Sequence, residues 1–266
     1  SFSRLSLTEF DRKWFTYIKG GEFRKWYGNI DLVVNWENEG QEIKSFSGST
    51  IRNKDFHKKE AVTWTLLASK NGMSARSIDK NCIFDNNGSS AFPTHDKLYL
   101  LGYLNSKVAN ACLTIENPTL AFQVGNIASL PYIDAPNKSD VNSFAQGCFS
   151  ISKADWDAHE TSWDFQRNPL WEQQLDIILD EMRERGVFSE DATINDIGPF
   201  NLPDLLQPLE ILVENYESEW EDLFHQLHRN EEELNRKFIE IYGLQDELTP
   251  DVPLDEITIL QKGEIS

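Results

Sequence analysis

The clearest hydrophobic pattern in the chain covers residues 98–132. Apolar residues recur at steps of three and four from the start of this stretch to Cys112, which places them on one face of a helix. Asn117-Pro118 ends the predicted helix, because a residue before proline is disfavoured in the α conformation. Alternation over residues 120–124 then predicts a strand. The pattern indicates a helix that lies on a short sheet and supports it.

Short alternating segments separated by turn residues predict a small sheet before this stretch. A capping-box sequence predicts a short helix over residues 6–18, and the polar residues 43–52 predict a mobile loop. Such short strands, joined by turns, favour a curved and mostly antiparallel sheet. The predicted strands are residues 30–36, 61–67, 74–78 and 82–84.

Long acidic helices are predicted from about residue 152 onwards, after a polar linker at 134–143. Gly186 and Gly243 are predicted to end two of them, and the tail from Asp246 is predicted to be extended. The predicted helices are residues 152–163, 169–185, 209–227 and 230–242. The predicted class is therefore α+β, with a small curved, mostly antiparallel sheet and a packed helix in domain 1–135, and an all-α helical domain at 150–266.

Composition favours a folded protein without a membrane span. The chain has 266 residues, of which 39% are hydrophobic and 12% aromatic, which argues against disorder. No apolar run is long enough to cross a bilayer. The three cysteines are far apart and odd in number, as expected for free thiols in a reducing cytoplasm. The first residue is not Met, so we expect a fragment of a longer, cytoplasmic protein.

Charge is distributed unevenly along the chain. The net charge is −19, yet residues 1–80 contain 14 basic and 10 acidic residues, so the rest carries −23. This asymmetry suggests a part that faces nucleic acid and a part that faces solvent or protein. The alternative is an acidic protein with no special partner, because net charge informs about solubility and steering rather than fold.

Catalytic signatures are mostly absent from the sequence. There is no glycine-rich phosphate loop, and His225 and His228 lack the further ligands of a metal site, so neither a catalytic residue nor a metal is predicted. One loose pattern leaves an alternative open. Asp31 on one strand and Glu42 with Lys44 on the next would position Mg²⁺ and a water, as in a Mg²⁺-dependent nuclease.

Eight sequence blocks, in order, carry a resemblance to a known family. The chain resembles the C-terminal, target-recognition part of the PglX-type adenine-specific DNA methyltransferases of BREX phage-defence systems. The blocks LLGYLNSK and NPTLAFQVGNI are also similar, more distantly, to the TaqI-like specificity domain of restriction-modification enzymes. The blocks are EFRKWYGN, VVNWENEG, AVTWT, SARSI, LLGYLNSK, NPTLAFQVGNI, TSWDF and EELNRKFIEIYGLQDELTP.

The resemblance implies recognition without catalysis. In these families a separate N-terminal domain binds S-adenosylmethionine and methylates adenine N6 through an Asn-Pro-Pro-aromatic loop. This chain has only Asn117-Pro118-Thr119 and Asn168-Pro169-Leu170, and it lacks a glycine-rich cofactor strand. The implied role is therefore DNA target recognition, with no cofactor in this chain and S-adenosylmethionine in the full-length enzyme. The implied partners are double-stranded DNA, the missing catalytic domain and other defence-system subunits.

Basic and aromatic residues that stand together are the predicted DNA contacts, because cations meet phosphates and rings stack on bases. Trp64 and Phe122 are expected to hold the sheet, and the amides of Gln123 and Asn126 are assigned more readily to turn structure than to adenine. The apolar seam over 209–227 either packs as ordinary core or makes the helical part a protein-docking module. The predicted DNA contacts are Arg24, Lys25, Tyr27, Lys58, Lys59, Lys70, Ser74 and Arg76.

Overall fold

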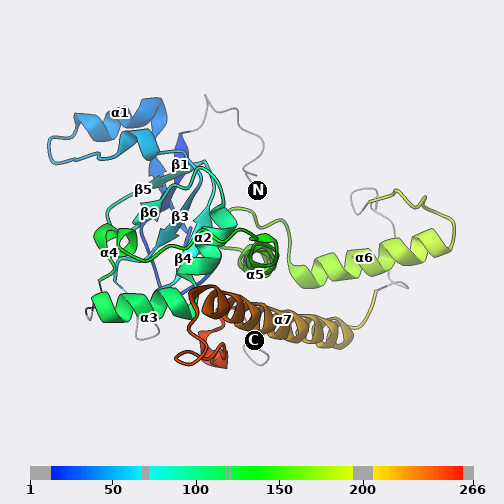
Figure 1. Cartoon of the computed structure of the whole chain (residues 1–266). Helices are drawn as coiled ribbons and strands as arrows, with labels where there is room; N and C mark the ends of the chain where they lie inside the picture. Colours follow the sequence, from blue (N-terminus) through cyan, green and yellow to red (C-terminus); the bar gives the residue numbers. More distant parts are fainter. Residues whose placement is uncertain (1–12, 68–71, 118, 120, 194–205, 260–266) are drawn as a thin grey trace.

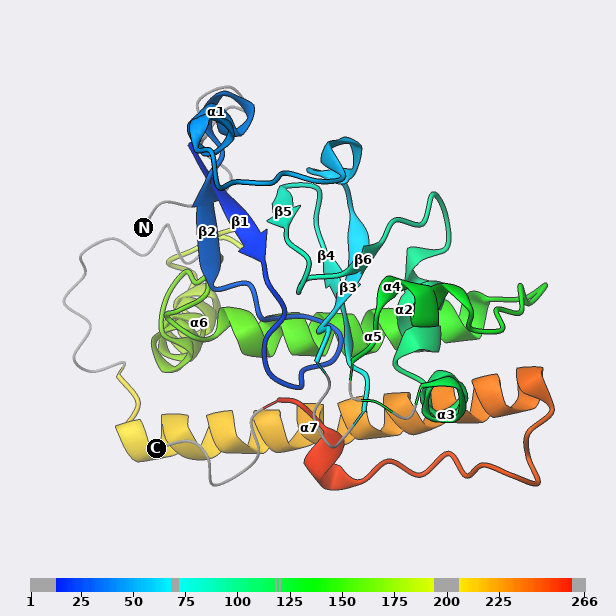
Figure 2. The same cartoon turned by 90° about the vertical axis from the view of Figure 1, so that its left-hand side faces the viewer.

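The computed structural model of the chain has the predicted α+β class (Figure 1). Two three-stranded sheets form the first part, with strand orders β2-β1-β5 and β4-β3-β6. Helix α2 (Lys97–Leu104) contacts β3 and β4, and α5 (Ser139–Asp157) contacts both α2 and α7 (Leu209–Tyr242). Figure 2 shows α5 and α7 running along the same side of the sheets. The structure describes residues 13–67, 72–117, 119, 121–193 and 206–259.

The first sheet contains a strand that the sequence pattern assigned to a helix. β1 (Trp14–Ile18) pairs antiparallel with β2 (Leu32–Asn35) and parallel with β5 (Cys82–Phe84). The helix predicted up to Ile18 is therefore wrong within the described residues. The segment WFTYI is aromatic and β-branched, and such residues pack well on a pleated surface between two neighbouring strands.

The second sheet confirms two predicted strands. β3 (Ala61–Trp64) is its centre and pairs antiparallel with β4 (Ala75–Ile78) and with β6 (Ser90–Ala91). Every residue of β3 and β4 is buried, so both faces of this sheet are covered. Trp64 donates a hydrogen bond from Nε1 to the Phe122 carbonyl at 2.8 Å, which confirms that this pair holds the sheet.

The predicted turn and loop after β2 contain helical structure. α1 (Glu37–Ser45) includes three residues with left-handed φ, and η1 (Lys54–Phe56) is a short 3-10 helix. Gly40 has φ +73°, and a Cβ there would lie 3.0 Å from the Trp36 ring, so glycine allows both the turn and the close packing. The predicted loop is therefore wrong at its start, because residues 43–45 end α1.

The long helix predicted from residue 98 is two helices, α2 (Lys97–Leu104) and α3 (Lys107–Glu116). Ser106 caps α3, since its hydroxyl accepts from the Ala109 N–H. Asn105 bonds both the N–H and the carbonyl of Ala75, at 2.8 and 3.0 Å, which fixes the break against β4. The strand predicted at 120–124 is wrong over its described residues, 121–124, where a single bridge joins Leu67 to Ala121 and α4 (Val124–Ala128) begins. Residue 120 lies outside the described residues.

The C-terminal part consists of α5 (Ser139–Asp157), α6 (Pro169–Glu184) and α7 (Leu209–Tyr242). The predicted linker is therefore wrong where α5 begins. The break predicted at Asn230 is also wrong, because α7 continues through it. Asn230 is buried and accepts from Gln226 Nε2 at 2.8 Å inside the helix. Gly186 and Gly243 have φ of +70° and +67° and follow α6 and α7, as predicted.

Within the described residues, the tail after α7 contains a turn at 245–247 and one short 3-10 helix, η4 (Leu254–Glu256), with no other helix or strand, and it packs on the protein. Val252, Ile257 and Ile259 are buried in the main core. Figure 2 shows this segment running back along α7 towards the sheets. Among the described residues, no helix is both long enough and apolar enough to cross a membrane.

One hydrophobic core joins the two segments that the sequence pattern separates. Its largest cluster contains Trp64 and Tyr103 from the first segment, and Leu234 and Phe238 from the second. The seam on α7 contributes Trp220 to the same cluster, so most of the seam is ordinary core. The predicted boundary between 135 and 150 therefore does not divide the core.

A matched pair of leucine substitutions on α7 tests this shared core. Leu234 is 2% exposed and Leu209 is 61% exposed. We expect Leu234→Ala to lower the free energy of unfolding by about 2–5 kcal/mol, since it leaves a cavity in the core. Leu209→Ala is expected to change it by less than about 0.5 kcal/mol. Urea denaturation followed by circular dichroism measures both, and equal effects would contradict the packing of α7.

Candidate nucleic-acid interface

A cavity of about 880 Å³ opens beside the first sheet. It lies between the segment 50–57, the strands β5 and β6, and the start of α4. The lining combines aromatic rings with side chains that form hydrogen bonds. Its polar members include Arg52, Asn53, Asn86, Ser90 and Gln123.

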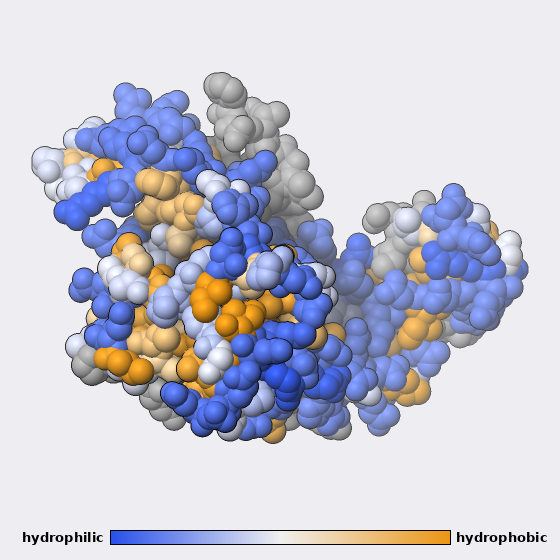
Figure 3. Space-filling model, viewed as in Figure 1, coloured by the Kyte–Doolittle hydropathy of each residue, from blue (hydrophilic) through white to orange (hydrophobic). Residues whose placement is uncertain are grey.

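The segment 44–59 forms one edge of this cavity and is the most basic part of its surroundings. It contains five basic residues and one acidic residue in a protein whose net charge is −19. Arg52, Lys54 and Lys59 are exposed on it. The surface over α1 and the residues that follow is mainly hydrophilic in Figure 3. The arrangement places exposed cations beside a cavity, as expected of a surface that contacts phosphates.

Two kinds of contact hold this edge in place. Lys58 donates to Glu39 at 2.5 Å, and this hydrogen bond lowers the pKa of the Glu39 carboxyl. Lys58 also lies 4.9 Å from the centre of the Phe15 ring. Beneath them, Ile43 and Ile51 pack on a small cluster with Phe15, Trp36 and Ile83 at its centre. Lys58 therefore helps to attach the segment 44–59 to the rest of the protein, and it also contributes to the positive charge of that segment.

Arg24 lies in the segment with the strongest basic and aromatic signal, and its side chain points into the protein. It donates to Asp155 of α5 at 2.6 Å and to the carbonyl of Tyr27 at 2.7 Å. Its guanidinium lies 4.9 Å from the centre of the Trp156 ring. Tyr27 is buried, with its ring 5.6 Å from that of Phe149. These contacts attach the segment to α5.

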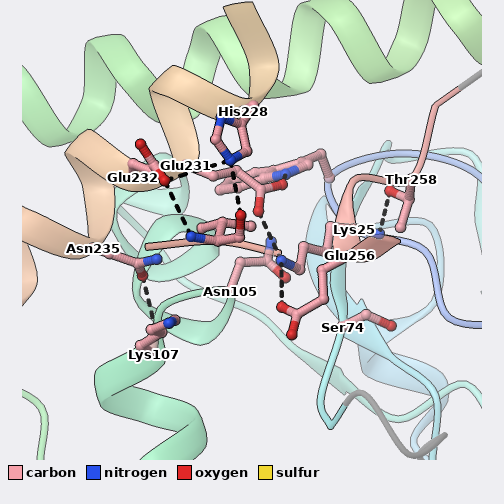
Figure 4. Close-up of polar contacts among 12 residues, drawn as sticks. Lys25, Ser74, Asn105, Lys107, His228, Glu231, Glu232, Asn235, Glu256 and Thr258 are labelled. Atoms are coloured by element: carbon pink, nitrogen blue, oxygen red, sulfur yellow. Dashed lines mark hydrogen bonds and ion pairs between the residues drawn. The ribbon is translucent and has the colours of Figure 1, made fainter. Parts of the chain in front are cut away.

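Lys25 is buried in the same segment and pairs with α7. Its Nζ donates to Glu231 at 2.7 Å, and Trp26 Nε1 donates to the other oxygen of Glu231, also at 2.7 Å (Figure 4). Glu256 lies 3.7 Å from Lys25, and Thr258 accepts from its backbone N–H at 3.2 Å. The C-terminal segment and α7 therefore close over Lys25.

Arg76 is fully buried in β4 and bonds only uncharged oxygens. Its guanidinium donates to the Arg24 carbonyl and to the Thr65 hydroxyl, both at 3.0 Å, and lies 3.5 Å from the Ser74 hydroxyl. Burial lowers the pKa of Arg76 to about 10, so the side chain remains charged at neutral pH. Ser74 is buried too and also accepts from the Arg24 N–H at 3.4 Å.

The eight predicted contacts are thus divided by their burial. Lys58 and Lys59 lie at the cavity edge, whereas Lys70 lies outside the described residues. The five others form internal contacts that connect the sheets to α5 and α7, and a DNA-contact role for them stays a prediction. They are Arg24, Lys25, Tyr27, Ser74 and Arg76.

Two amides left between adenine and turn structure have a structural role here. The Asn126 side chain accepts from the Gln123 N–H at 3.0 Å and completes a capping box at the start of α4. Gln123 also lines the cavity. This agrees with the structural assignment made from the sequence. A polar residue at the third helical position often accepts a hydrogen bond from the backbone N–H of the N-cap residue.

The nuclease alternative loses its predicted geometry. Glu42 and Lys44 lie on helix α1 rather than on a second strand, and Glu42 accepts from Asn35 Nδ2 at 2.6 Å. The described residues contain no group of three His, Cys, Asp or Glu side chains placed to hold a metal ion. The strand assignment on which the Asp31 pattern depended is therefore wrong.

The sequence pattern did not predict some of the residues that line this cavity. Arg52 lines the cavity although it stands in a stretch read as a plain loop, and Phe56, Phe84 and Phe92 line it from separate segments. One local signal existed: Phe46 and Phe56 are aromatic residues within a polar, basic stretch, where no buried face is predicted. Both are exposed in the structure.

Comparison with known proteins shows homology to two methyltransferases. The chain is 35% identical over 261 residues to the adenine-specific methyltransferase PglX of Lacticaseibacillus casei (strain Zhang), covering 94% of this chain and 19% of that protein. It is 38% identical over 180 residues to the adenine-specific methyltransferase BrxX of Escherichia coli O9:H4 (strain HS), covering 64% of this chain and 14% of that protein. No family model matches the chain.

This homology confirms the resemblance on which the sequence analysis relied. The chain spans less than a fifth of the length of each of these relatives. It is therefore homologous to one part of each of these two proteins.

A pair of lysine substitutions tests the internal role of Lys25. Lys25→Met leaves Glu231 as a buried carboxylate without its cation, so we expect a loss of about 3–5 kcal/mol in the free energy of unfolding. Lys59→Met, at an exposed lysine of the cavity edge, is expected to change it by less than about 0.5 kcal/mol. Urea denaturation compares the two, and an unchanged stability in Lys25→Met would show that this side chain is available for other contacts.

Proposed function

We propose that this chain, homologous to part of the adenine-specific methyltransferases PglX and BrxX, is a DNA target-recognition module. It would hold double-stranded DNA while a catalytic domain outside the chain methylates adenine N6. The observation that carries the proposal is the exposed basic segment 44–59 beside a cavity, in an otherwise acidic protein. Homology to adenine-specific methyltransferases supports it.

Phosphate contacts are assigned to the cavity edge. Arg52, Lys54 and Lys59 project from one short segment, so they can follow the sugar–phosphate backbone together. Such contacts set the register of the protein on the duplex and make binding sensitive to salt. The partly buried Arg24 and the buried Lys25 and Arg76 then act indirectly, since their contacts fix the sheets that carry this edge.

Sequence reading is assigned to amides that line the cavity. Asn53, Asn86 and Gln123 stand around it, and the Asn and Gln amides are suited to paired hydrogen bonds with adenine. Gln123 combines this position with its role at the start of α4. The same cavity would therefore bring base edges close to the cations that hold the backbone.

Cofactor binding is a separate part of the proposal. The names of the relatives imply S-adenosylmethionine for the full-length enzymes. Asp85 is the one acidic residue that lines the described cavity, and its side chain accepts from the Asn87 and Gly88 N–H groups. We assign cofactor binding and methyl transfer to the part of the enzyme outside this chain.

A second function concerns the acidic arm, defined as α6 and the first half of α7. Residues 169–184 contain five acidic residues and one basic residue, and residues 209–222 contain six acidic and no basic residues. Trp171 is 51% exposed on this arm. An exposed tryptophan among carboxylates fits a protein surface better than DNA. Loss of co-purification with other subunits of the defence system in Trp171→Ser would support docking, and unchanged co-purification would contradict it.

The main proposal predicts a specific change in salt dependence. Replacing Arg52, Lys54 and Lys59 by alanine removes up to three phosphate contacts. The slope of log affinity against log salt concentration should become shallower by roughly 2–3, at about 0.9 per contact. Fluorescence anisotropy with a short labelled duplex at several salt concentrations measures this slope.

The control for this experiment removes the same charge elsewhere. Arg185, Arg229 and Arg236 are exposed on the acidic helices or at their ends. Their joint replacement by alanine should leave the slope unchanged, because they lie away from the cavity edge. If both triple variants change the slope equally, net charge governs binding and the assigned face is wrong.

A further inference from the structure

Five aromatic rings form a continuous line along the cavity wall. The ring centres are 4.8 Å apart for Phe56 and Phe92, and 5.4 Å apart for Phe92 and Phe84. The line continues from Phe84 to His57 at 5.1 Å and from His57 to Trp36 at 5.0 Å. All five residues line the same cavity. They come from the residue before α1, from η1 and the residue after it, from β5 and from the residue after β6. The tertiary structure therefore brings the five rings together.

The outer end of this wall is open to the cavity and to solvent. Phe56 is 43% exposed, which is unusual for a phenylalanine that serves only as packing. Burial lowers the pKa of His57, so its imidazole is neutral at neutral pH and adds a flat, uncharged ring to the wall. Neighbouring rings in the line are tilted by 43–88° relative to one another, so a planar ligand would stack on the exposed ring of Phe56 at its outer end.

Polar groups at the other boundaries define what that ligand carries. The amides of Asn86 and Gln123 line the same cavity, where they can bond the edge of a base. Arg52 lines the mouth, and the Lys59 ammonium lies 5.3 Å from the centre of the Phe56 ring. A planar, hydrogen-bonding ring joined to an anionic group is a nucleotide. The cavity of about 880 Å³ is within the ~300–1,000 Å³ common for small-molecule sites.

We propose that this cavity binds one unstacked nucleotide of the DNA, with its base against the aromatic wall and its phosphate beside Arg52 and Lys59. This inference rests on the proposed function, since the nucleotide reaches the cavity as part of bound DNA. Methylation of a base inside a duplex requires its extrusion, which leaves nucleotides unstacked and unpaired. A pocket for such a nucleotide would stabilise the opened duplex.

A bulged duplex provides the test. The full 266-residue chain is titrated with a duplex that contains one unpaired 2-aminopurine and with a fully paired duplex of the same length. Stacking contributes ~1–3 kcal/mol per base, so we expect roughly tenfold tighter binding of the bulged duplex. The 2-aminopurine fluorescence should fall as its base stacks on the wall.

Two phenylalanine variants separate stacking from general DNA binding. Phe56→Ala should remove most of the preference for the bulged duplex and leave affinity for the paired duplex unchanged. Phe46→Ala is the matched control, because Phe46 is 69% exposed on the same basic segment and does not line the cavity. It should preserve both affinities. The exposure of both rings makes unfolding of either variant unexpected.

The outcomes distinguish the two proposals. Binding of both duplexes with equal affinity would overturn the nucleotide pocket and preserve DNA recognition. A bulge preference that survives in Phe56→Ala would also overturn the pocket. Binding of neither duplex would overturn the pocket and the proposed function together. If free AMP competes as effectively as the bulged duplex, the pocket belongs to free nucleotides and the assignment to DNA is wrong.

Discussion

The fold depends on one buried carboxylate. Glu231 of α7 accepts from the Lys25 ammonium and from the Trp26 indole, each at 2.7 Å. Trp26 in turn accepts from the Ser77 N–H and donates its own N–H to Ala75, so it is attached to β4 through its backbone. A carboxylate this deeply buried is tolerated only when its charge is paired and its oxygens are bonded. These contacts therefore fix the position of the longest helix relative to the sheets. Because the sheets carry the cavity edge, its position is fixed as well.

The same contact explains which parts of the site the sequence could predict. A lysine beside a tryptophan has the same local pattern whether it meets a phosphate or a buried carboxylate. Lys25 and Glu231 are separated by 206 positions, so no local signal reveals the pairing. Features set by local chemistry were predictable: the alternation of β3, the glycines after α6 and α7, and the α+β class. The helix start predicted at Asn230 is wrong, because the Asn230 side chain accepts a hydrogen bond from Gln226 within α7.

The cavity could not be predicted from the sequence for a different reason. Its aromatic wall combines Trp36, Phe56, Phe84 and Phe92, which lie in four separate segments. Trp36, Phe84 and Phe92 each have an ordinary local explanation as a core residue, whereas Phe56 stands in a polar, basic stretch. Only the tertiary structure shows that the four rings share one wall. The basic segment beside them was visible in part, since Lys58 and Lys59 form a local cluster, whereas Arg52 acquires its position through the turn at Asn53, which has φ 51°.

The uneven charge of the chain favours one face of the molecule for the proposed DNA binding. The basic segment 44–59 and the acidic arm lie at different ends of the molecule, as Figure 1 shows for α1 and α6. Surface charges act over about 8–10 Å at physiological salt, so each region influences mainly what approaches it directly. For a duplex bound as proposed, the arm repels the phosphates and the cavity edge attracts them. The acidic composition that seemed to argue against DNA binding then restricts the duplex to one face, where the cations and the aromatic wall lie together.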